Sequence, residues 1–367
     1  MKIHQLTFEK DNIMSKRLIA ILLAVTVIIG CSKKPNNPED QQINGLDGWD
    51  ISKSNYDFDI NPRDIYFVNP NIGFVVGYNG DIYKTTDSGQ TWMKKNSETT
   101  LHLFSVFFLN EDVGFVSSQA SSGCLDADCD KGSVLLKTTD GGETWTKTFF
   151  PDYTRILSLK FFDALKGIAI IYTPEYPNSR DDEYVAITSD GGINWNLLDL
   201  AIIPYCDKLF YVDNTIFVIG ENQKIFKSSD YGYNWETINT PIEAYNSVRN
   251  LYFYNESIGY IDGITSVYKT TNGGLNWIKT NFPFTNFGTI HFYNENEGFN
   301  IEPVMVYEGG DFPTFKGSIC YETKNGGESW SKSALVKSLY LGLIFFPQRN
   351  LGYGFNLSEF CTIKRKE

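Results

Sequence analysis

The feature that most constrains the fold is a short segment that recurs six times, with 40 to 53 residues between successive tryptophans. Every copy has the form Ser/Thr-x-Asp/Asn-x-Gly-x-x-Trp. The copies are Thr85–Trp92, Thr138–Trp145, Thr188–Trp195, Ser228–Trp235, Thr270–Trp277 and Thr323–Trp330. Self-similarity at such a period is typical of folds built from stacked supersecondary units. The repeat, rather than any single segment, is therefore expected to determine the architecture.

Each copy has the composition of a tight hairpin turn. Its Asp or Asn side chain can accept hydrogen bonds from nearby backbone N–H groups, its Gly can adopt a positive φ, and its Trp can pack between neighbouring sheets. The predicted structural acids and amides are Asp87, Asp140, Asp190, Asp230, Asn272 and Asn325. Upstream of the hairpin segment lies a second repeated pattern, for example at residues 66–74 and 252–260. In it, an apolar strand, a polar turn ending in Gly and another strand follow one another. Four strands per repeat cannot bury both faces alone, so the repeats should stack radially.

The number of blades follows from the seven tryptophans. Trp49 has no hairpin turn before it, yet residues 48–53 resemble the strand that follows each turn. After Trp330 the chain offers three apolar strands and no fourth. We expect the strand around Trp49 to complete the last blade and remove the open edges. The predicted fold is all-β, a seven-bladed β-propeller of four-stranded antiparallel blades over residues 47–367.

The N-terminal region reads as a secretion signal. From Met14, the predicted true start, two basic residues precede the apolar stretch Leu18–Ile29, which is too short to span a bilayer. Residues 1–30 are assigned to a signal peptide and residues 31–46 to a flexible tether. The run Val27–Cys31 resembles the lipobox of bacterial lipoproteins, which implies lipidation of Cys31. The alternative is an ordinary signal peptide with an incidental cysteine. Ser32 after the cysteine favours the outer membrane by analogy.

Charge and composition narrow the partners. The chain carries a net charge of −12, with 15% aromatic and 21% charged residues, a mixture that supports a folded protein. Beyond residue 30 there are 28 basic and 42 acidic residues, which argues against nucleic acid or anionic lipid as a partner. His4, His102 and His291 have no metal-ligand spacing, and no phosphate-binding loop precedes a helix. We expect a monomer without a cofactor that binds a protein or a glycan.

Two family resemblances follow from these residues. The hairpin segment resembles the Asp-box, or BNR, repeat. Residues 73–80 together with residues 82–87 are more similar to the photosystem II stability/assembly factor-like propellers, and this resemblance covers about Trp49 to Lys364. It implies a seven-bladed, non-catalytic protein that holds other proteins during assembly. Three insertions depart from the compact blades of that group.

The insertions indicate a binding face. They fall between the second and third strands of blades two, three and six, at residues 119–131, 173–183 and 301–316, and therefore on the face opposite the hairpin turns. Long loops on a rigid scaffold suit binding, although they could instead merely cover blade edges. The same face should receive three arginines at the channel mouth as a positive focus, unless each is a solvated structural residue. The candidate residues are Arg63, Arg155, Arg249, Tyr176, Phe312 and Phe315.

An enzyme is the alternative. Sialidases share the Asp-box propeller, and a sialidase-like glycoside hydrolase or lyase could act at the channel mouth. The Arg-Ile-Pro signature of those enzymes is missing, because residues 61–64 read Asn-Pro-Arg-Asp. A catalytic carboxylate pair cannot be assigned, since its separation is spatial. The sequence favours a non-enzymatic envelope lipoprotein that acts as a binding or assembly scaffold.

Two further patterns carry weaker signals. Alternating acids, as in a calcium loop, occur at Asp126, Asp128 and Asp130, but Lys131 and Lys137 occupy positions where such a loop needs Gly and Glu, so a solvated acidic loop is the preferred interpretation. Among the cysteines, a local disulfide between Cys124 and Cys129 stays open. Cys206, Cys320 and Cys361 remain, and buried apolar thiols are the preferred interpretation for Cys320 and Cys361.

Overall fold

The first long strand of the described chain pairs with the last. Strand β2 (Trp49–Lys53) runs antiparallel to β29 (Glu359–Arg365), with Trp49 opposite Arg365. The Trp49 side chain is only 3% exposed and meets the Phe299 ring of the preceding blade edge-on at 5.1 Å between centroids. This arrangement confirms that the N-terminal strand completes the last blade and so removes its open edge.

The structure is a computed structural model. It describes residues 42–43, 48–53, 61–119, 132–152, 154–172, 183–198, 208–220, 224–242, 248, 250–262, 266–283, 290–306, 314–337, 341–356 and 359–366. All of them belong to one compact unit, Gln41–Glu367. Residues 1–40 lie outside the described residues. Among the described residues, no helix combines the length and the apolar character needed to span a bilayer.

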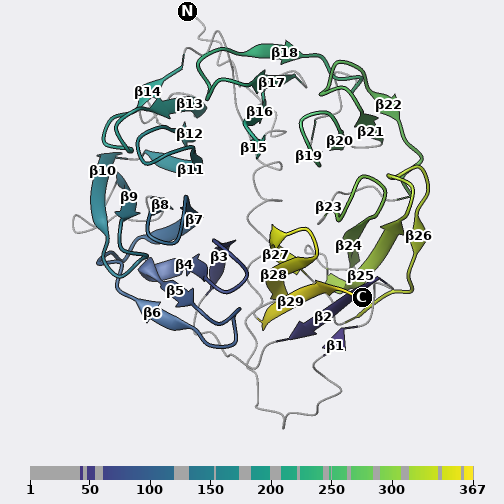
Figure 1. Ribbon diagram of the computed structural model, residues 1–367, viewed down its shortest axis with the longest axis horizontal. Coiled ribbons are helices and arrows are strands. Elements are labelled where there is room, and N and C mark those ends of the chain that lie inside the picture. The colour runs from purple at the N-terminus through teal and green to yellow at the C-terminus, as the bar shows by residue number, and fades with distance from the viewer. Residues whose placement is uncertain are drawn as a thin grey trace, which may run out of the picture. The chain divides into compact units, whose positions relative to one another are not determined.

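The strands form seven antiparallel blades around a ring, which confirms the predicted seven-bladed all-β propeller (Figure 1). The strand nearest the ring axis comes first in each of blades one to six. Blade one holds β3 (Pro62–Phe67), β4 (Gly73–Gly77), β5 (Ile82–Thr85) and β6 (Met93–Lys95); blade two holds β7 (His102–Phe108), β8 (Gly114–Gln119), β9 (Gly132–Thr138) and β10 (Thr146–Asp152); blade three holds β11 (Arg155–Phe161), β12 (Gly167–Tyr172), β13 (Glu183–Thr188) and β14 (Asn196–Leu197).

Within blade one, a short 3-10 helix, η2 (Tyr78–Gly80), links β4 to β5. Blades four to seven repeat the strand order of the first three. Blade four holds β15 (Lys208–Val212), β16 (Thr215–Ile219), β17 (Ile225–Ser228) and β18 (Glu236–Ile238); blade five holds β19 (Asn250–Phe253), β20 (Gly259–Asp262), β21 (Val267–Thr270) and β22 (Ile278–Lys279); blade six holds β23 (His291–Phe292), β24 (Gly298–Val306), β25 (Thr314–Thr323) and β26 (Ser331–Lys332); blade seven holds β27 (Leu341–Gln348), β28 (Leu351–Asn356), β29 and β2.

Two details differ from a uniform ring of four-stranded blades. A further strand, β1 (Gln42–Ile43), pairs with β2 and makes blade seven five-stranded. It lies inside the range 31–46 that we assigned to a tether, so the last part of that range belongs to the propeller. In addition, blades two and three join into one sheet, because Arg155 pairs with Gln119 across their boundary.

The repeated hairpins, which we call box turns, share one hydrogen-bonded structure. In the box turn of blade one, the Asp87 carboxylate accepts hydrogen bonds from the Thr91 amide at 2.8 Å and the Thr91 hydroxyl at 2.6 Å. The Gly89 amide donates to the Thr85 hydroxyl at 2.9 Å. In every box turn, the glycine three residues before the tryptophan has a positive φ. These glycines are Gly89, Gly142, Gly192, Gly232, Gly274 and Gly327.

Each box turn packs on the preceding blade, which is why glycine is required there. A Cβ at Gly142 would lie 2.8 Å from the Phe74 ring of blade one, and a Cβ at Gly89 would lie 2.3 Å from the Phe360 ring of blade seven. The tryptophan follows the same plan, since the Trp92 ring contacts Phe67 of its own blade and Phe360 of blade seven edge-on. The box turns therefore connect neighbouring blades around the ring.

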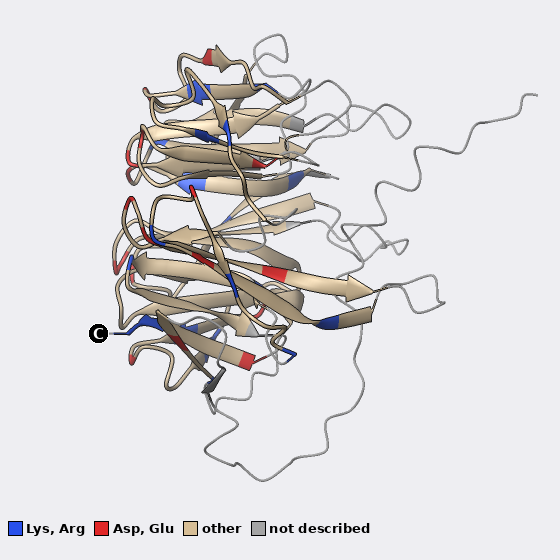
Figure 2. Cartoon of the chain, turned by 90° about the vertical axis from the view of Figure 1, so that its right-hand side faces the viewer, with Lys and Arg blue, Asp and Glu red and all other residues tan. Residues whose placement is uncertain are grey.

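The box turns and the turns between first and second strands lie on one face, as predicted. Backbone hydrogen bonds join the two kinds of turn within a blade, for example from the Gly141 amide to the Asp112 carbonyl and from the Gly326 amide to the Asn296 carbonyl, both at 2.8 Å. Figure 2, a side view, shows turns along the edge at which the C-terminus lies. The connections between second and third strands consequently leave from the opposite face.

One predicted loop is wrong over most of its length. Residues 301–306 and 314–316 were expected to form an insertion loop, but they extend β24 and β25, and Phe315 pairs with Met305. The ladder between the two strands continues past a bulge at Val304, as far as the pair Val306 and Thr314. The segments 120–131, 173–182 and 307–313 lie outside the described residues. Cys320 and Cys361 are buried thiols, as expected.

Candidate binding face

The face opposite the box turns, which we call the loop face, carries the first residues of the innermost strands. Arg63 is the second residue of β3 and Arg155 is the first residue of β11, so the two arginines hold nearly the same place in blades one and three. Blade two lies between them, and each arginine contacts different aromatic rings. The structure thus places both on the predicted face without joining them into one cluster.

Arg63 is held by aromatic rings from two blades. Its guanidinium carbon lies 4.3 Å from the centroid of Tyr78, in η2, and 5.2 Å from that of Phe104, in β7. The Nε atom is buried and has no hydrogen-bond partner among the described residues. Burial lowers the pKa of Arg63 from its ordinary value. Its charge is therefore orientated by stacking while one donor is left unsatisfied.

His102 completes the surroundings of Arg63. Its ring lies 4.3 Å from that of Tyr78, and its Nδ1 accepts a hydrogen bond of 3.2 Å from the Asn79 amide. Burial, with the nearby Arg63 charge as a second cause, lowers the pKa of His102 from its ordinary value. A neutral imidazole leaves Arg63 as the cation of this group. The sequence had set His102 aside because it lacks metal-ligand spacing.

Arg155 repeats the stacking in blade three. Its guanidinium carbon lies 5.0 Å from the centroid of Tyr172, the residue directly opposite on β12. Its Nε atom, like that of Arg63, is buried without a hydrogen-bond partner among the described residues. Two arginines on one face thus share stacking on tyrosine and an unsatisfied donor.

Next to these arginines, the inner strands hold groups that sequence reasoning missed. Asp64 accepts hydrogen bonds of 2.9 Å from the backbone amides of Ile65 and Val106, but desolvation by burial outweighs them and raises its pKa to about 6. Lys160 Nζ lies 4.0 Å from the centroid of Phe107 and 3.9 Å from that of Tyr211, and burial lowers its pKa to about 8. These side chains come from four different blades.

Aromatic contacts run from one inner strand to the next. The Tyr66 ring lies 4.7 Å from Phe345 of blade seven and 5.2 Å from Phe107 of blade two. Its hydroxyl donates to the Phe108 carbonyl at 2.9 Å. Lys160 continues this series into blade four through Tyr211. The only hint in the sequence was the aromatic or long side chain in each innermost strand, which also fits ordinary core packing.

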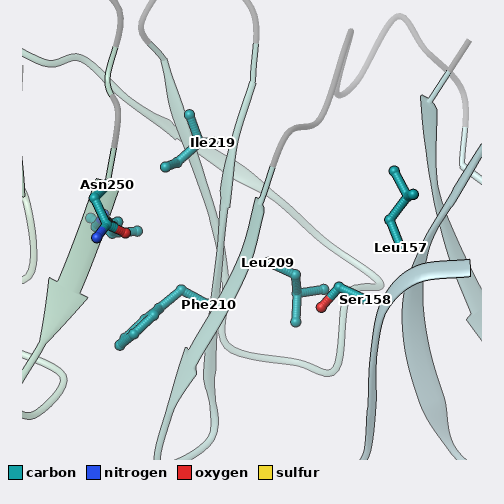
Figure 3. Close-up of a pocket in the computed structure, with 7 residues that line it drawn as sticks. Leu157, Ser158, Leu209, Phe210, Ile219 and Asn250 are labelled. Carbon is teal, nitrogen blue, oxygen red and sulfur yellow. Dashed lines mark hydrogen bonds between the residues drawn. The ribbon is translucent and has the colours of Figure 1, made fainter. Parts of the chain in front are cut away.

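A pocket of about 360 Å³ opens among the inner strands of blades three, four and five. Figure 3 shows Leu209 and Phe210, adjacent in β15, pointing to different sides, as alternation along a strand requires. The lining of the pocket is mainly aliphatic, with two polar side chains. It consists of Leu157, Ser158, Leu209, Phe210, Ile219, Asn250 and Leu251. Ser158 lies three positions after Arg155 along β11, so the pocket and this arginine share one strand.

Several predicted site residues cannot be placed. Cys31, Cys124, Cys129, Asp126, Asp128, Asp130, Tyr176, Arg249 and Phe312 lie outside the described residues. Of the predicted binding residues, Arg63 and Arg155 are on the loop face, and Phe315 is in β25 rather than in a loop. Within the described ranges, no group of three or more His, Cys, Asp or Glu side chains is arranged to hold a metal ion.

Fold and site together define a seven-bladed propeller with one face of repeated hydrogen-bonded turns and another with stacked arginines and an apolar pocket. The family model described as Photosynthesis system II assembly factor YCF48 matches residues 46–152. A curated relative, the Photosystem II assembly lipoprotein Ycf48 of Synechococcus sp. (strain CC9902), is 31% identical over 93 residues. That alignment covers 24% of this chain and 24% of the relative, so the chain spans about a quarter of the relative's length.

Solved structures resemble the chain over a longer range. A structure titled YCF48 bound to D1 peptide has a TM-score of 0.63 and 16% identity, and covers 89% of this chain and 100% of its own. YCF48 from Cyanidioschyzon merolae has a TM-score of 0.62 and 15% identity, with coverages of 86% and 99%. At such identities these structures show the fold alone. Together with the sequence matches they confirm the resemblance to the photosystem II assembly factor-like propellers.

Proposed function

We propose that this protein is a non-enzymatic, lipid-anchored scaffold that binds a peptide segment of another envelope protein on its loop face. The observation that carries the proposal is the pair of arginines, Arg63 and Arg155, each stacked on tyrosine with a buried and unsatisfied Nε donor. A similar propeller has been solved with a bound peptide, which supports a protein partner over a glycan.

The chemistry of the arginines suits a carboxylate. A guanidinium presents paired N–H donors that match the two carboxylate oxygens, and a charge-assisted pair of this kind is about twice as strong as a neutral hydrogen bond. Stacking fixes each guanidinium before the ligand arrives, so less side-chain entropy is lost on binding. An acidic side chain or a terminal carboxylate of the peptide would pair with the terminal N–H groups of each guanidinium, because the Nε atom itself is buried.

The pocket supplies a second kind of contact. Leu157, Leu209 and Ile219 offer an aliphatic lining, while Ser158 and Asn250 add polar groups at the same site. A pocket of about 360 Å³ has room for one large apolar side chain. We infer a ligand that places an apolar residue in the pocket and a carboxylate near Arg155.

The anchor belongs to the same proposal. Cys31 follows a lipobox-like run, and the curated relative is itself named a lipoprotein. We infer that Cys31 carries the lipid, that residues 1–30 are removed, and that Ser32 directs the protein to the outer membrane. Mass spectrometry of the mature protein tests the anchor, because lipidation changes the mass of the N-terminal peptide.

Quantitative cross-linking in the native envelope, followed by affinity measurement with the recovered peptide, tests the binding face. Changing Arg63 and Arg155 to Ala together should weaken binding by about tenfold or more, because two charge-assisted contacts are lost. Arg349 provides the matched control, since it stacks on Tyr254 at 3.7 Å and lies on the box-turn face. Arg349→Ala should leave the affinity unchanged.

Two results would contradict the proposal. An affinity that the double variant does not alter would remove the loop face from binding. Turnover of chromogenic glycosides or sialosides by the purified protein, lost on changing Arg63 to Ala, would instead favour the hydrolase alternative.

A further inference from the structure

The box turns differ at one position in a way that their shared structure does not require. Two residues before each tryptophan stands an exposed side chain: Gln90, Glu143, Ile193, Tyr233, Leu275 and Glu328 in blades one to six. It is polar or charged in blades one, two and six. It is large and apolar in the three consecutive blades three, four and five.

One of the polar versions, Glu143, has a clear role. Glu143 forms ion pairs with Lys84 at 3.3 Å and with Lys95 at 2.8 Å, both from the preceding blade. The apolar versions are instead directed to solvent, with Ile193 exposed by 67%, Tyr233 by 53% and Leu275 by 76%. An apolar side chain that contributes neither to the core nor to an ion pair on three neighbouring repeats indicates a surface for an external contact.

Nearby residues extend this surface. Figure 1 shows β14, β18 and β22, the outer strands of blades three to five, following one another along the rim of the ring. Leu197 on β14 and Ile278 on β22 are exposed, and so is Tyr231 in the box turn of blade four. We call the six residues the apolar arc: Ile193, Leu197, Tyr231, Tyr233, Leu275 and Ile278.

The arc runs over blades that are in direct contact. The Tyr231 ring lies 4.9 Å from that of Phe162 in blade three. Glycines tie the same blades together, because a Cβ at Gly232 would lie 3.0 Å from Ile168 of blade three, and one at Gly274 would lie 2.9 Å from Ile238 of blade four. The three tips are therefore held on one rigid part of the ring.

We propose that the apolar arc is a membrane-contact surface that inserts into the apolar-polar boundary of the bilayer to which Cys31 tethers the protein. Isolated hairpin tips carrying tyrosine and branched aliphatic residues suit the interface, where amphipathic rings lie at headgroup level and aliphatic groups reach the acyl chains. A fluid surface accepts separate tips without the shape complementarity that a protein partner requires.

The length of the tether supports this occupant, and the step rests on the lipid anchor of the proposed function. About ten residues lie between Cys31 and Gln42, the first residue of β1, and their full extension spans at most about 40 Å. The propeller is thereby kept close to one bilayer at a millimolar effective concentration, at which a weak apolar contact is sufficient. Since the chain carries a net charge of −12, the contact should not depend on anionic lipid.

Partition into phosphatidylethanolamine/phosphatidylcholine vesicles tests the proposal without the anchor. The mature chain, residues 31–367 with Cys31→Ser, should cosediment with the vesicles, and Ile193→Ser, Tyr233→Ser and Leu275→Ser combined should lower its partition coefficient by about tenfold or more. Phe149→Ser is the matched control, because Phe149 is an exposed aromatic residue on β10 outside the arc. It should leave partition unchanged, and adding phosphatidylglycerol should not increase the partition of the parent, because the protein and this lipid are both negatively charged.

The outcomes separate the proposals. Equal partition of the parent and the triple variant, or no partition of a parent whose thermal unfolding is normal, overturns the membrane assignment. A triple variant that keeps its partition but loses a cross-linked protein assigns the arc to a protein partner instead. Lipidation of Cys31 is read separately by mass, so an unmodified Cys31 rejects the anchor alone.

Discussion

The surroundings of the carboxyl groups shift their pKa values in opposite directions on the two faces of this ring. On the box-turn face, hydrogen bonds stabilise carboxylates: the Thr144 hydroxyl and amide lower the pKa of Asp140 to about 2. On the loop face, burial raises the pKa of Asp64 to about 6, and the buried Nε donors of Arg63 and Arg155 have no hydrogen-bond partner among the described residues. The first face thus stabilises its carboxylates in the ionised form, whereas burial on the second disfavours ionisation of Asp64.

This difference separates stability from recognition. The box turns join each blade to the one before it, so a change there alters contacts that are repeated around the whole ring. The loop face is built from strand starts and connections of different lengths, and such connections tolerate variation. Binding groups are therefore expected where the repeat ends, and the variants below test that division.

The largest effect is expected at the ring closure. Trp49→Ala removes a side chain that is 3% exposed and packs between blades six and seven, so the free energy of unfolding should fall by about 3–5 kcal/mol. Urea denaturation followed by circular dichroism measures it. Met93→Ala, on the outer strand β6, is the control and should change stability by less than about 0.5 kcal/mol. Equal effects of the two variants would mean that the closure of blade seven by Trp49 does not stabilise the ring.

A smaller loss is expected in a single box turn. Gly142→Ala introduces a Cβ at φ 83°, where it would lie 2.8 Å from the Phe74 ring, and should destabilise the protein by about 2–4 kcal/mol. Gln90→Ala, at an exposed position of the equivalent turn in blade one, should be nearly neutral. If thermal unfolding shows the same midpoint for both variants, the interblade role of the box turn is wrong.

The smallest effects concern pH and distinguish the two faces by sign. Because the folded-state pKa of Asp64 is raised to about 6, the folded protein holds its proton where the unfolded chain does not, and ionisation destabilises the fold as pH rises from about 4 to 6. Asp64→Asn should remove this loss, which is roughly 1–3 kcal/mol. Denaturant midpoints at each pH, compared with those of the unchanged protein, measure it.

Asp140→Asn should act in the opposite direction. The pKa of Asp140 is lowered to about 2, so its contribution is present above the ordinary pKa and disappears as pH falls toward 2. The unchanged protein should therefore exceed this variant in stability at neutral pH and lose that advantage in acid. Parallel pH profiles for Asp64→Asn and Asp140→Asn would remove the contrast between the faces.

The repeat made the ring predictable, and its limits explain what was not. Six copies of one turn determine the blade plan, and the unmatched Trp49 indicates how it closes. The extension of β24 and β25 through Phe315 was missed because an insertion was read as a loop, and no alternation of apolar and polar residues marks Ile301–Val306 as a strand. The surroundings of Asp64 and Lys160 were missed because they depend on side chains from several blades, which no local pattern reports.

The pairing of β2 with β29 has a consequence for how the molecule is made. Trp49 is synthesised long before Arg365, and until Glu359–Arg365 has emerged the early strand has no partner and the last sheet keeps a bare edge. Closing so large a loop is among the slowest steps of a β-rich chain. A truncated chain that lacks these seven residues cannot close the ring. Proteases that cleave unfolded segments would therefore degrade truncated chains and spare complete ones.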